Sequence, residues 1–204
     1  MKYPNTIKEY TASLLNMFNN LRVENQDQIT KVPVLYATRE KLTEIEGLNY
    51  DDLIKRNFQV VPRGSLQITS IEYDPSRQLN PKSNVRSGQF INKDEVQPSG
   101  APYNITYSLN ILTKSVSEAT MIIEQVCSRF NPYLNNRFVE TFEGAGKSPL
   151  LVKILSVDLT HPEFDGENDE LIVEFQFMVY GTMFEPVRSV ERIETTKLNF
   201  EVKV

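Results

Sequence analysis

The most constraining feature of the sequence is a strictly alternating run from Pro102 to Lys114. Apolar or aromatic side chains occupy every second position from 103 to 111, with asparagine, serine or threonine between them. A period of two places successive side chains on opposite faces of a β-strand, so the run predicts a long strand with one face in a hydrophobic core. The other face, with Asn104, Thr106 and Ser108, is expected to be hydrated or paired.

Other segments favour β-structure. Residues 21–25 and 29–37 read as short strands with a polar hairpin loop between them, and Pro33 favours a place at a sheet edge. In residues 58–74 the apolar face changes partway along, which predicts a bulge or bend. Three more β segments are expected at 150–160, 170–181 and 191–204.

Two segments have the apolar spacing of amphipathic helices. The first carries its stripe from Ile7 to Leu21, with Asn5 or Thr6 as its cap. The second, residues 116–130, begins at Ser115 or Ser117 and ends at Asn131-Pro132. A short third helix is expected over roughly residues 38–46, stopping at Gly47.

These elements predict one α+β domain over residues 1–204: a largely antiparallel, mixed sheet with two main helices packed on it. Residues 76–101 form a long loop in this prediction, and residues 190–204 form a C-terminal strand. A connection of that length without regular elements is unusual, which suggests either a function or disorder.

Composition excludes several classes of protein. With 204 residues, 40% of them hydrophobic, the chain can bury a real core, and a disordered main state is excluded. A net charge of −5 argues against a chain-wide basic surface for duplex DNA or anionic lipid. A single cysteine, Cys127, fits a reducing compartment, and neither a signal peptide nor a long apolar run is present, so we expect an untargeted, soluble cytosolic chain.

No enzyme motif is complete. Residues 144–148, GAGKS, lack the earlier glycine of a phosphate-binding loop, because that position is Thr141. The acidic residues around His161 have the wrong spacing for a calcium loop and favour a solvated hairpin tip. Cys127 lies on the apolar stripe of its helix, where cysteine usually behaves as a small hydrophobe. We therefore expect no catalytic residue, cofactor or metal.

Several stretches, taken in order, carry a resemblance to a known family. They include NMFNNLRVE, KVPVLYATREKL, VVPRGSLQITSIEYDPSRQLN, residues 101–140 and ELIVEFQFMVYGTMFEP. Together they cover most of the chain, which resembles the tail sheath stabilisation and completion proteins, or tail terminators, of contractile-tailed bacteriophages. The chain is shorter than expected for that family beyond Pro186.

The resemblance implies a structural virion protein with no catalytic step. It implies a hexameric ring at the head-proximal end of the tail, formed in the host cytoplasm during assembly. The ring ends tube growth, stabilises the last sheath ring and offers a surface for neck or head attachment. Its implied partners are further copies of itself, the tail sheath protein, the tail tube or its terminator, and neck or connector proteins. No membrane or sequence-specific nucleic acid is expected, although DNA would pass through the lumen.

We expect the ring interface in the alternating strand, at Asn104, Thr106 and Ser108, and in the loop before it. Such an interface must be heterologous and close after a fixed number of copies. Arg63 matches the family's Pro-Arg at a strand start, and its expected role is an ion pair or a stacked surface guanidinium.

The loop cations have three interpretations: contacts with acidic neighbouring subunits, contacts with DNA in the lumen, or a solvated loop. These cations are Arg77, Lys82, Arg86 and Lys93.

The C-terminal segment is a candidate edge for strand addition by sheath subunits. Its candidate contact residues are Ile193, Leu198 and Phe200.

Two alternatives remain at this stage. One is another virion part of related fold, such as a neck, tube-terminating or baseplate adaptor protein. The other is a small cytosolic enzyme that uses Cys127 with His161, or a metal at the acidic turn.

Overall fold

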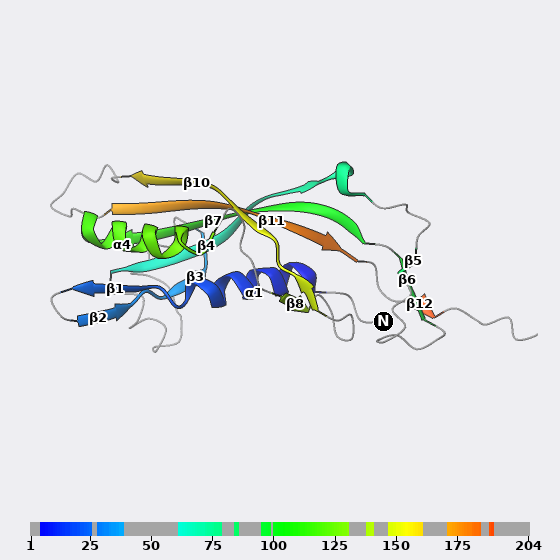
Figure 1. Ribbon diagram of the computed structural model, residues 1–204, viewed down its shortest axis with the longest axis horizontal. Coiled ribbons are helices and arrows are strands. Elements are labelled where there is room, and N and C mark those ends of the chain that lie inside the picture. The colour runs from blue at the N-terminus through cyan, green and yellow to red at the C-terminus, as the bar shows by residue number, and fades with distance from the viewer. Residues whose placement is uncertain are drawn as a thin grey trace, which may run out of the picture.

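The structure is a computed structural model. It describes residues 5–25, 28–38, 61–78, 84–85, 95–98, 100–130, 138–140, 147–160, 171–184 and 188–189. In this part of the chain a long sheet has both described α-helices on one side (Figure 1). The mixed α+β class expected from the sequence is confirmed.

The main sheet has five strands in the order β10-β11-β7-β4-β3. Their bounds are β3 Val34–Tyr36, β4 Arg63–Tyr73, β7 Ala101–Thr113, β10 Val152–Thr160 and β11 Leu171–Met183. All neighbours are antiparallel except β3 and β4, which run parallel. The predicted segments at 150–160 and 170–181 are therefore confirmed as β10 and β11, and Pro33 does precede a strand at the sheet edge.

The alternating run is the central strand β7. Its aliphatic and aromatic side chains at 105, 107, 109 and 111 are fully buried on one face, as the sequence predicts. They pair in register with apolar residues of β4 and β11, such as Leu66 and Phe175 opposite Leu109. This face of the sheet is the core face, and the opposite one is called the polar face below.

Two register shifts bend the sheet. One lies in β4 between Ile68 and Ser70, which confirms the bulge predicted for residues 58–74. The other lies in β10 between Ile154 and Ser156. Each shift moves the following side chains to the other face, which explains why apolar alternation changes phase at these points.

Helix α1, Thr6–Phe18, packs its stripe on the core face. The buried rings of Phe18 and Phe130 meet Phe177 of β11 there, with ring centroids 5.1 and 5.2 Å apart. Burying an aromatic side chain stabilises the fold by about 1.5–3 kcal/mol relative to leaving it exposed, so this cluster anchors the helices to the sheet.

Helix α4, Val116–Cys127, starts with a reciprocal cap. The Glu118 N–H donates to Ser115 Oγ, and the Lys114 N–H donates to a Glu118 carboxylate oxygen at 2.9 Å. The pair resembles a capping box, except that the carboxylate accepts from the residue before the cap. Of the two predicted caps, the structure selects Ser115.

Three smaller sheets complete the described chain. Their strands are β1 Arg22–Asn25 with β2 Gln28–Lys31, then β5 Asn84–Val85, β6 Glu95–Pro98 and β12 Arg188–Ser189, and finally β8 Phe138–Glu140 with β9 Lys147–Pro149. A hairpin begins near residue 22 as predicted, but the strand expected over residues 29–37 is divided: β2 pairs with β1, and β3 joins the main sheet. Strands β5 and β6 lie within residues 76–101, which the sequence analysis treats as a loop, and they are too short for periodicity to detect. The predicted helix at 38–46 and strand at 190–204 lie outside the described residues.

Candidate interaction surfaces

The centre of the polar face is paired within the chain. Ser108 and Asn110 are buried, with the Asn110 side-chain N–H donating to Ser108 Oγ at 2.9 Å. Ser108 Oγ in turn donates to the Glu174 carboxylate at 3.3 Å. Of the two states expected for this face, hydrated or paired, the paired one holds here.

Two oxygen atoms beside this network are buried without a protein hydrogen-bond donor. They are Ser65 Oγ and Asn110 Oδ1, and their residues are directly opposite in the β4–β7 register. Leaving a buried polar atom unpaired costs about 1–3 kcal/mol. The middle of the polar face therefore contains buried oxygen atoms whose hydrogen bonds are not made within the protein.

Arg77 ties the turn after β4 to the sheet. It ends the short 3-10 helix η2, Pro75–Arg77, and its Nε donates to Asp74 Oδ2 at 2.8 Å. Its Nη2 donates to the Tyr103 carbonyl at 3.0 Å and to Asn104 Oδ1 at 2.8 Å. The guanidinium also lies 5.3 Å from the ring centroid of Tyr180. Arg77 and Asn104, both predicted interface residues, are thus brought together in one local network.

The same network perturbs Asp74. Hydrogen bonds from Ser76 and then from Arg77 lower the pKa of the Asp74 carboxyl to about 2. A carboxylate that accepts several hydrogen bonds is stabilised in its charged form. Asp74 therefore stays ionised and holds the turn in place throughout the neutral and mildly acidic range.

Other predicted positions are placed only in part. Arg63 is the first residue of β4, on the polar face opposite Leu112, as a Pro-Arg strand start predicts. Thr106 is half-buried, and its carbonyl accepts a hydrogen bond from Thr69. The remaining predicted positions, at 82, 86, 93, 193, 198 and 200, lie outside the described residues. An interface role for any of the predicted residues stays a prediction.

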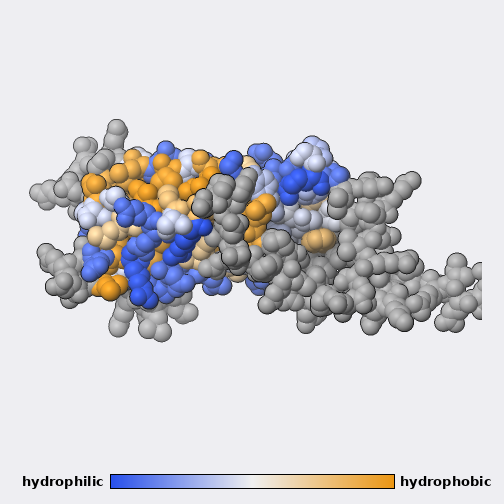
Figure 2. Space-filling model, viewed as in Figure 1, coloured by the Kyte–Doolittle hydropathy of each residue, from blue (hydrophilic) through white to orange (hydrophobic). Residues whose placement is uncertain are grey.

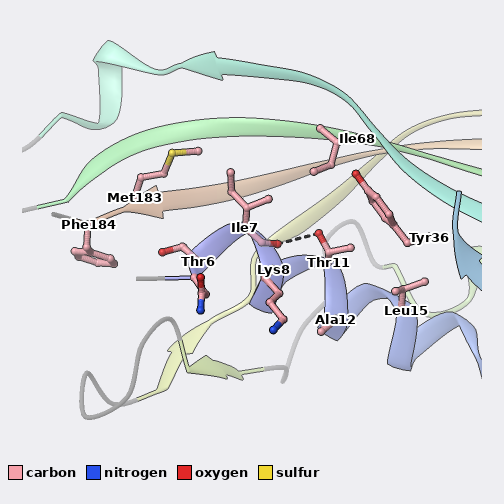
Figure 3. A pocket seen from close by; sticks show the side chains of 11 residues that line it. Thr6, Ile7, Lys8, Thr11, Ala12, Leu15, Tyr36, Ile68, Met183 and Phe184 are labelled. Atoms are coloured by element: carbon pink, nitrogen blue, oxygen red, sulfur yellow. Dashed lines mark hydrogen bonds between the residues drawn. The ribbon is translucent and has the colours of Figure 1, made fainter. Parts of the chain in front are cut away.

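An apolar slot opens between α1 and β4. Its volume is about 790 Å³, and Figure 3 shows Ile68 of β4 and Tyr36 of β3 above the flank of α1. Ile7, Ala12 and Leu15 of α1 line it from below, with Lys8 the charged residue of its lining. The slot lies beside the end of β3, where β4 continues without a neighbouring strand in the described part of the chain.

The far edge of the sheet, at β10, is also apolar. Leu155 and Leu159 are 42% and 45% exposed, and Leu151 just before the strand is 41% exposed. Figure 2 shows hydrophobic residues gathered on the side of the molecule where β10 and α4 lie. Edge strands are usually protected by charges, bulges or shortness. The nine residues of β10 include Lys153, Asp158 and a bulge, yet they leave two leucines exposed along the edge.

The enzyme-like features gain little from the structure. Cys127 packs against the core, and burial raises the pKa of its thiol, which disfavours the reactive thiolate. Lys147 and Ser148 of the glycine-rich stretch lie in strand β9, whereas a phosphate-binding loop leads into a helix. His161 and its acidic neighbours lie outside the described residues. In the described segments, three or more metal-ligating side chains do not come together, and neither helix there is long and apolar enough to span a membrane.

Comparison with known proteins shows the family of the chain. Residues 1–204 match the family described as T4-like virus Myoviridae tail sheath stabiliser. The chain belongs to this family. It is therefore a structural component of a contractile phage tail, as the resemblance in the sequence predicts.

The similarity to two individual proteins is lower in sequence identity than a family match over the whole chain would suggest. The chain is 25% identical over 215 residues to "Tail completion protein gp15" of Enterobacteria phage T4, covering 97% of this chain and 78% of that protein. A solved structure, the sheath/tube terminator of the PVC extracellular contractile injection system in its extended state, aligns with 12% identity and a TM-score of 0.46. That alignment covers 98% of this chain, which spans 63% of the terminator's length.

Sequence reasoning missed the slot and the β10 edge. The slot is made by residues from α1, β3, β4 and β11, which are far apart in the sequence. For β10, the signal was present: apolar residues occupy the even positions 150, 152 and 154 and then the odd positions 155, 157 and 159. That break in the pattern marks the bulge and the residues it leaves exposed.

Proposed function

We propose that this protein assembles into a closed ring on the head-proximal end of a contractile tail. There it ends growth of the inner tube, holds the last ring of sheath subunits and presents a surface to the neck. Assembly and binding, without a catalytic step, make up its function. The observation that carries the proposal is the match of the whole chain to the tail sheath stabiliser family.

The structure supports a role in assembly. Its longest strands form an open sheet, and apolar residues stay exposed at both sides of that sheet. Exposed apolar patches on a soluble protein commonly mark interaction sites. A ring requires two different patches on each copy, because a heterologous contact joins one patch to another and closes only at the correct rotation.

The polar face is suited to a different role from the slot and the edge. Its central side chains bond to one another, and Arg77 is held by Asp74 and Asn104. A surface whose polar groups are already ordered is suited to contacts that need a fixed shape. We infer that the part of this face around Arg77, Asp74 and Asn104 meets a partner as a rigid body, with the neck, the sheath and the lumen as its candidate neighbours. The centre of the face, at Ser108 and Asn110, is buried within the chain.

The proposal is tested by mixing the purified protein with preassembled tubes and sheath, followed by electron microscopy. We expect a ring on one end only, with sheath that no longer dissociates or contracts spontaneously. Tails incubated with buffer alone serve as the control. Protein that ignores tails, or that binds only at the baseplate end, would overturn the proposal and favour an adaptor role.

A further inference from the structure

Two long strands of the sheet have an outer edge without a strand partner in the described chain. One is β10, which is the last strand on its side. The other is β4 beyond residue 66, because β3 pairs only with Gly64, Ser65 and Leu66. The backbone N–H and C=O groups on such an edge are ready to pair with another strand. The two edges lie on opposite sides of the same sheet.

The β4 edge lies beside the apolar slot. Past the bulge, Ile71 and Tyr73 return to the core face but are 44% and 49% exposed, since α1 does not cover them. Ile68 lines the slot itself (Figure 3). An added strand here would gain main-chain hydrogen bonds from β4 and apolar contacts from the slot, which is the usual pattern of strand addition.

The β10 edge has the complementary character. It is extended over nine residues, and Leu155 and Leu159 are exposed along an edge that pairs with no other strand in the described part of the chain. The β10 strand of another copy would supply backbone hydrogen bonds to the outer edge of β4. Its exposed leucines would supply side chains that fit an apolar slot.

The strand directions also agree. Each step from β10 to β11, β7 and β4 is antiparallel, so β4 runs opposite to β10. A second copy, placed beside the first in the same orientation, brings its β10 antiparallel to the first copy's β4. The sheet then continues from copy to copy without either chain reversing direction.

We propose that the open edge of β4 binds β10 of the next copy, which makes this edge pairing the contact between subunits. The proposal rests on the proposed ring and names the surfaces that build it. It joins two different patches, as a heterologous ring contact requires. Pairing of β10 with another β10 would use one patch only, close as a dimer and leave the slot empty.

Cysteine cross-linking tests this pairing. Ser156 and Asp158 of β10 lie on the polar face, and so do Ser70 and Glu72 of β4. Within one chain the two strands are three strand spacings apart, about 14 Å, which is too far for a disulfide. Each position is changed to cysteine singly in a Cys127→Ala background, and the β10 variants are mixed with the β4 variants and oxidised.

The pattern of cross-links reports both contact and direction. An antiparallel register pairs 156 with 72 and 158 with 70 together, or else only one of the two remaining combinations. A parallel register pairs 156 with 70 and 158 with 72 together, or else only one of the pairs 156 with 72 and 158 with 70. We expect an antiparallel pattern, seen in concentrated protein or in protein bound to tails. A parallel pattern, or cross-links only between identical β10 variants, would overturn the proposal.

A charge at the edge gives an independent test, since lysine is the usual protection against edge pairing. Leu159→Lys is expected to lose ring formation while keeping its fold. Ile29→Lys is the matched control, because Ile29 is 65% exposed in the separate β1–β2 sheet, and it should form rings normally. Normal rings from Leu159→Lys, without any of the four cross-links, would contradict edge pairing.

The two proposals fail in different ways. Wild-type rings on tails without cross-links, and unaffected by Leu159→Lys, leave the proposed function standing and refute only the edge pairing. Wild-type protein that does not bind tails refutes the function, while cross-linking of the free protein still decides the pairing.

Discussion

The two ends of the five-stranded sheet differ in what covers their core face. At one end α1 and α4 bury Leu14, Phe18, Phe175 and Phe177 completely. At the other end the same face carries Ile71 and Tyr73 about half exposed, and the Arg77 network orders the polar face behind them. The difference teaches that the core face serves two purposes: at the covered end it holds the fold, and at the open end it keeps apolar surface available for a partner. The exposed leucines of β10 lie on the outer edge of the sheet, beside the covered end.

The largest effect is expected at the covered end. Phe177→Ala removes a fully buried ring that meets Phe18, Phe130 and Phe175, and a truncation of this kind costs about 3–5 kcal/mol. Chemical denaturation measures the loss in the free energy of unfolding. Tyr73→Ala, the matched change at the open end, should cost about 1 kcal/mol or less. Equal losses at the two positions would remove the distinction between the ends.

Between the two ends of the sheet lies Gly181, where an added side chain is expected to destabilise the fold. A Cβ at Gly181 would lie 2.8 Å from Tyr10 Cε2, and the Tyr10 hydroxyl accepts a hydrogen bond from the Thr182 N–H at 3.1 Å. Because that bond and burial hold the ring in place, Gly181→Ala should cost about 1–3 kcal/mol in the free energy of unfolding.

Thermal unfolding of Gly181→Ala, alone and combined with Tyr10→Leu, tests this cause. The smaller side chain leaves room for the new methyl group, so adding Gly181→Ala to Tyr10→Leu should cost less than adding it to the wild type. The same loss in both backgrounds would show that Tyr10 is not the source of the strain.

A smaller and local effect is expected at the open end. Arg77→Met removes the hydrogen bonds to Asp74, Tyr103 and Asn104 but keeps an aliphatic side chain, and the loss in global stability should be about 1 kcal/mol. Hydrogen exchange should become faster at residues 74–78 and stay unchanged at residues 109–112 of β7. Faster exchange at both sites would mean that the two ends unfold as one unit.

The sequence predicts features that depend on neighbouring residues better than features that depend on residues far apart in the chain. The strand at 102–114, the bulge in 58–74 and a helix cap at Ser115 or Ser117 were all predicted, because each depends on residues a few positions apart. For Arg77 the sequence left three interpretations open, an acidic neighbouring subunit, DNA or a solvated loop, and it gave no sign of the hydrogen bonds to carbonyls 26 and 104 residues away. Periodicity shows that Ser108 and the Tyr107 before it point to opposite faces, but it does not show that both faces are buried there.

The candidate surfaces were harder to predict than the fold. The family resemblance implied a ring, and the interface expected for it, polar positions on β7 and the loop before that strand, stays a prediction. That strand is central, and both its edges are occupied by β4 and β11. Edge strands become visible only once the strand order is known, which no local pattern in this sequence specifies.

The smallest expected effect is the pH dependence of the open end. The Asp74 carboxyl has a pKa of about 2 in the folded chain, against an ordinary value of 3.8. A lowered folded-state pKa contributes stability that is fully present above the ordinary value and is lost as the pH falls toward the lowered one. The free energy of unfolding of the wild type should therefore fall more steeply between about pH 4 and pH 2 than that of Asp74→Asn. Subtracting the two curves cancels the other carboxylates, and parallel curves would mean that Asp74 titrates normally and that the open end is not held by its charge.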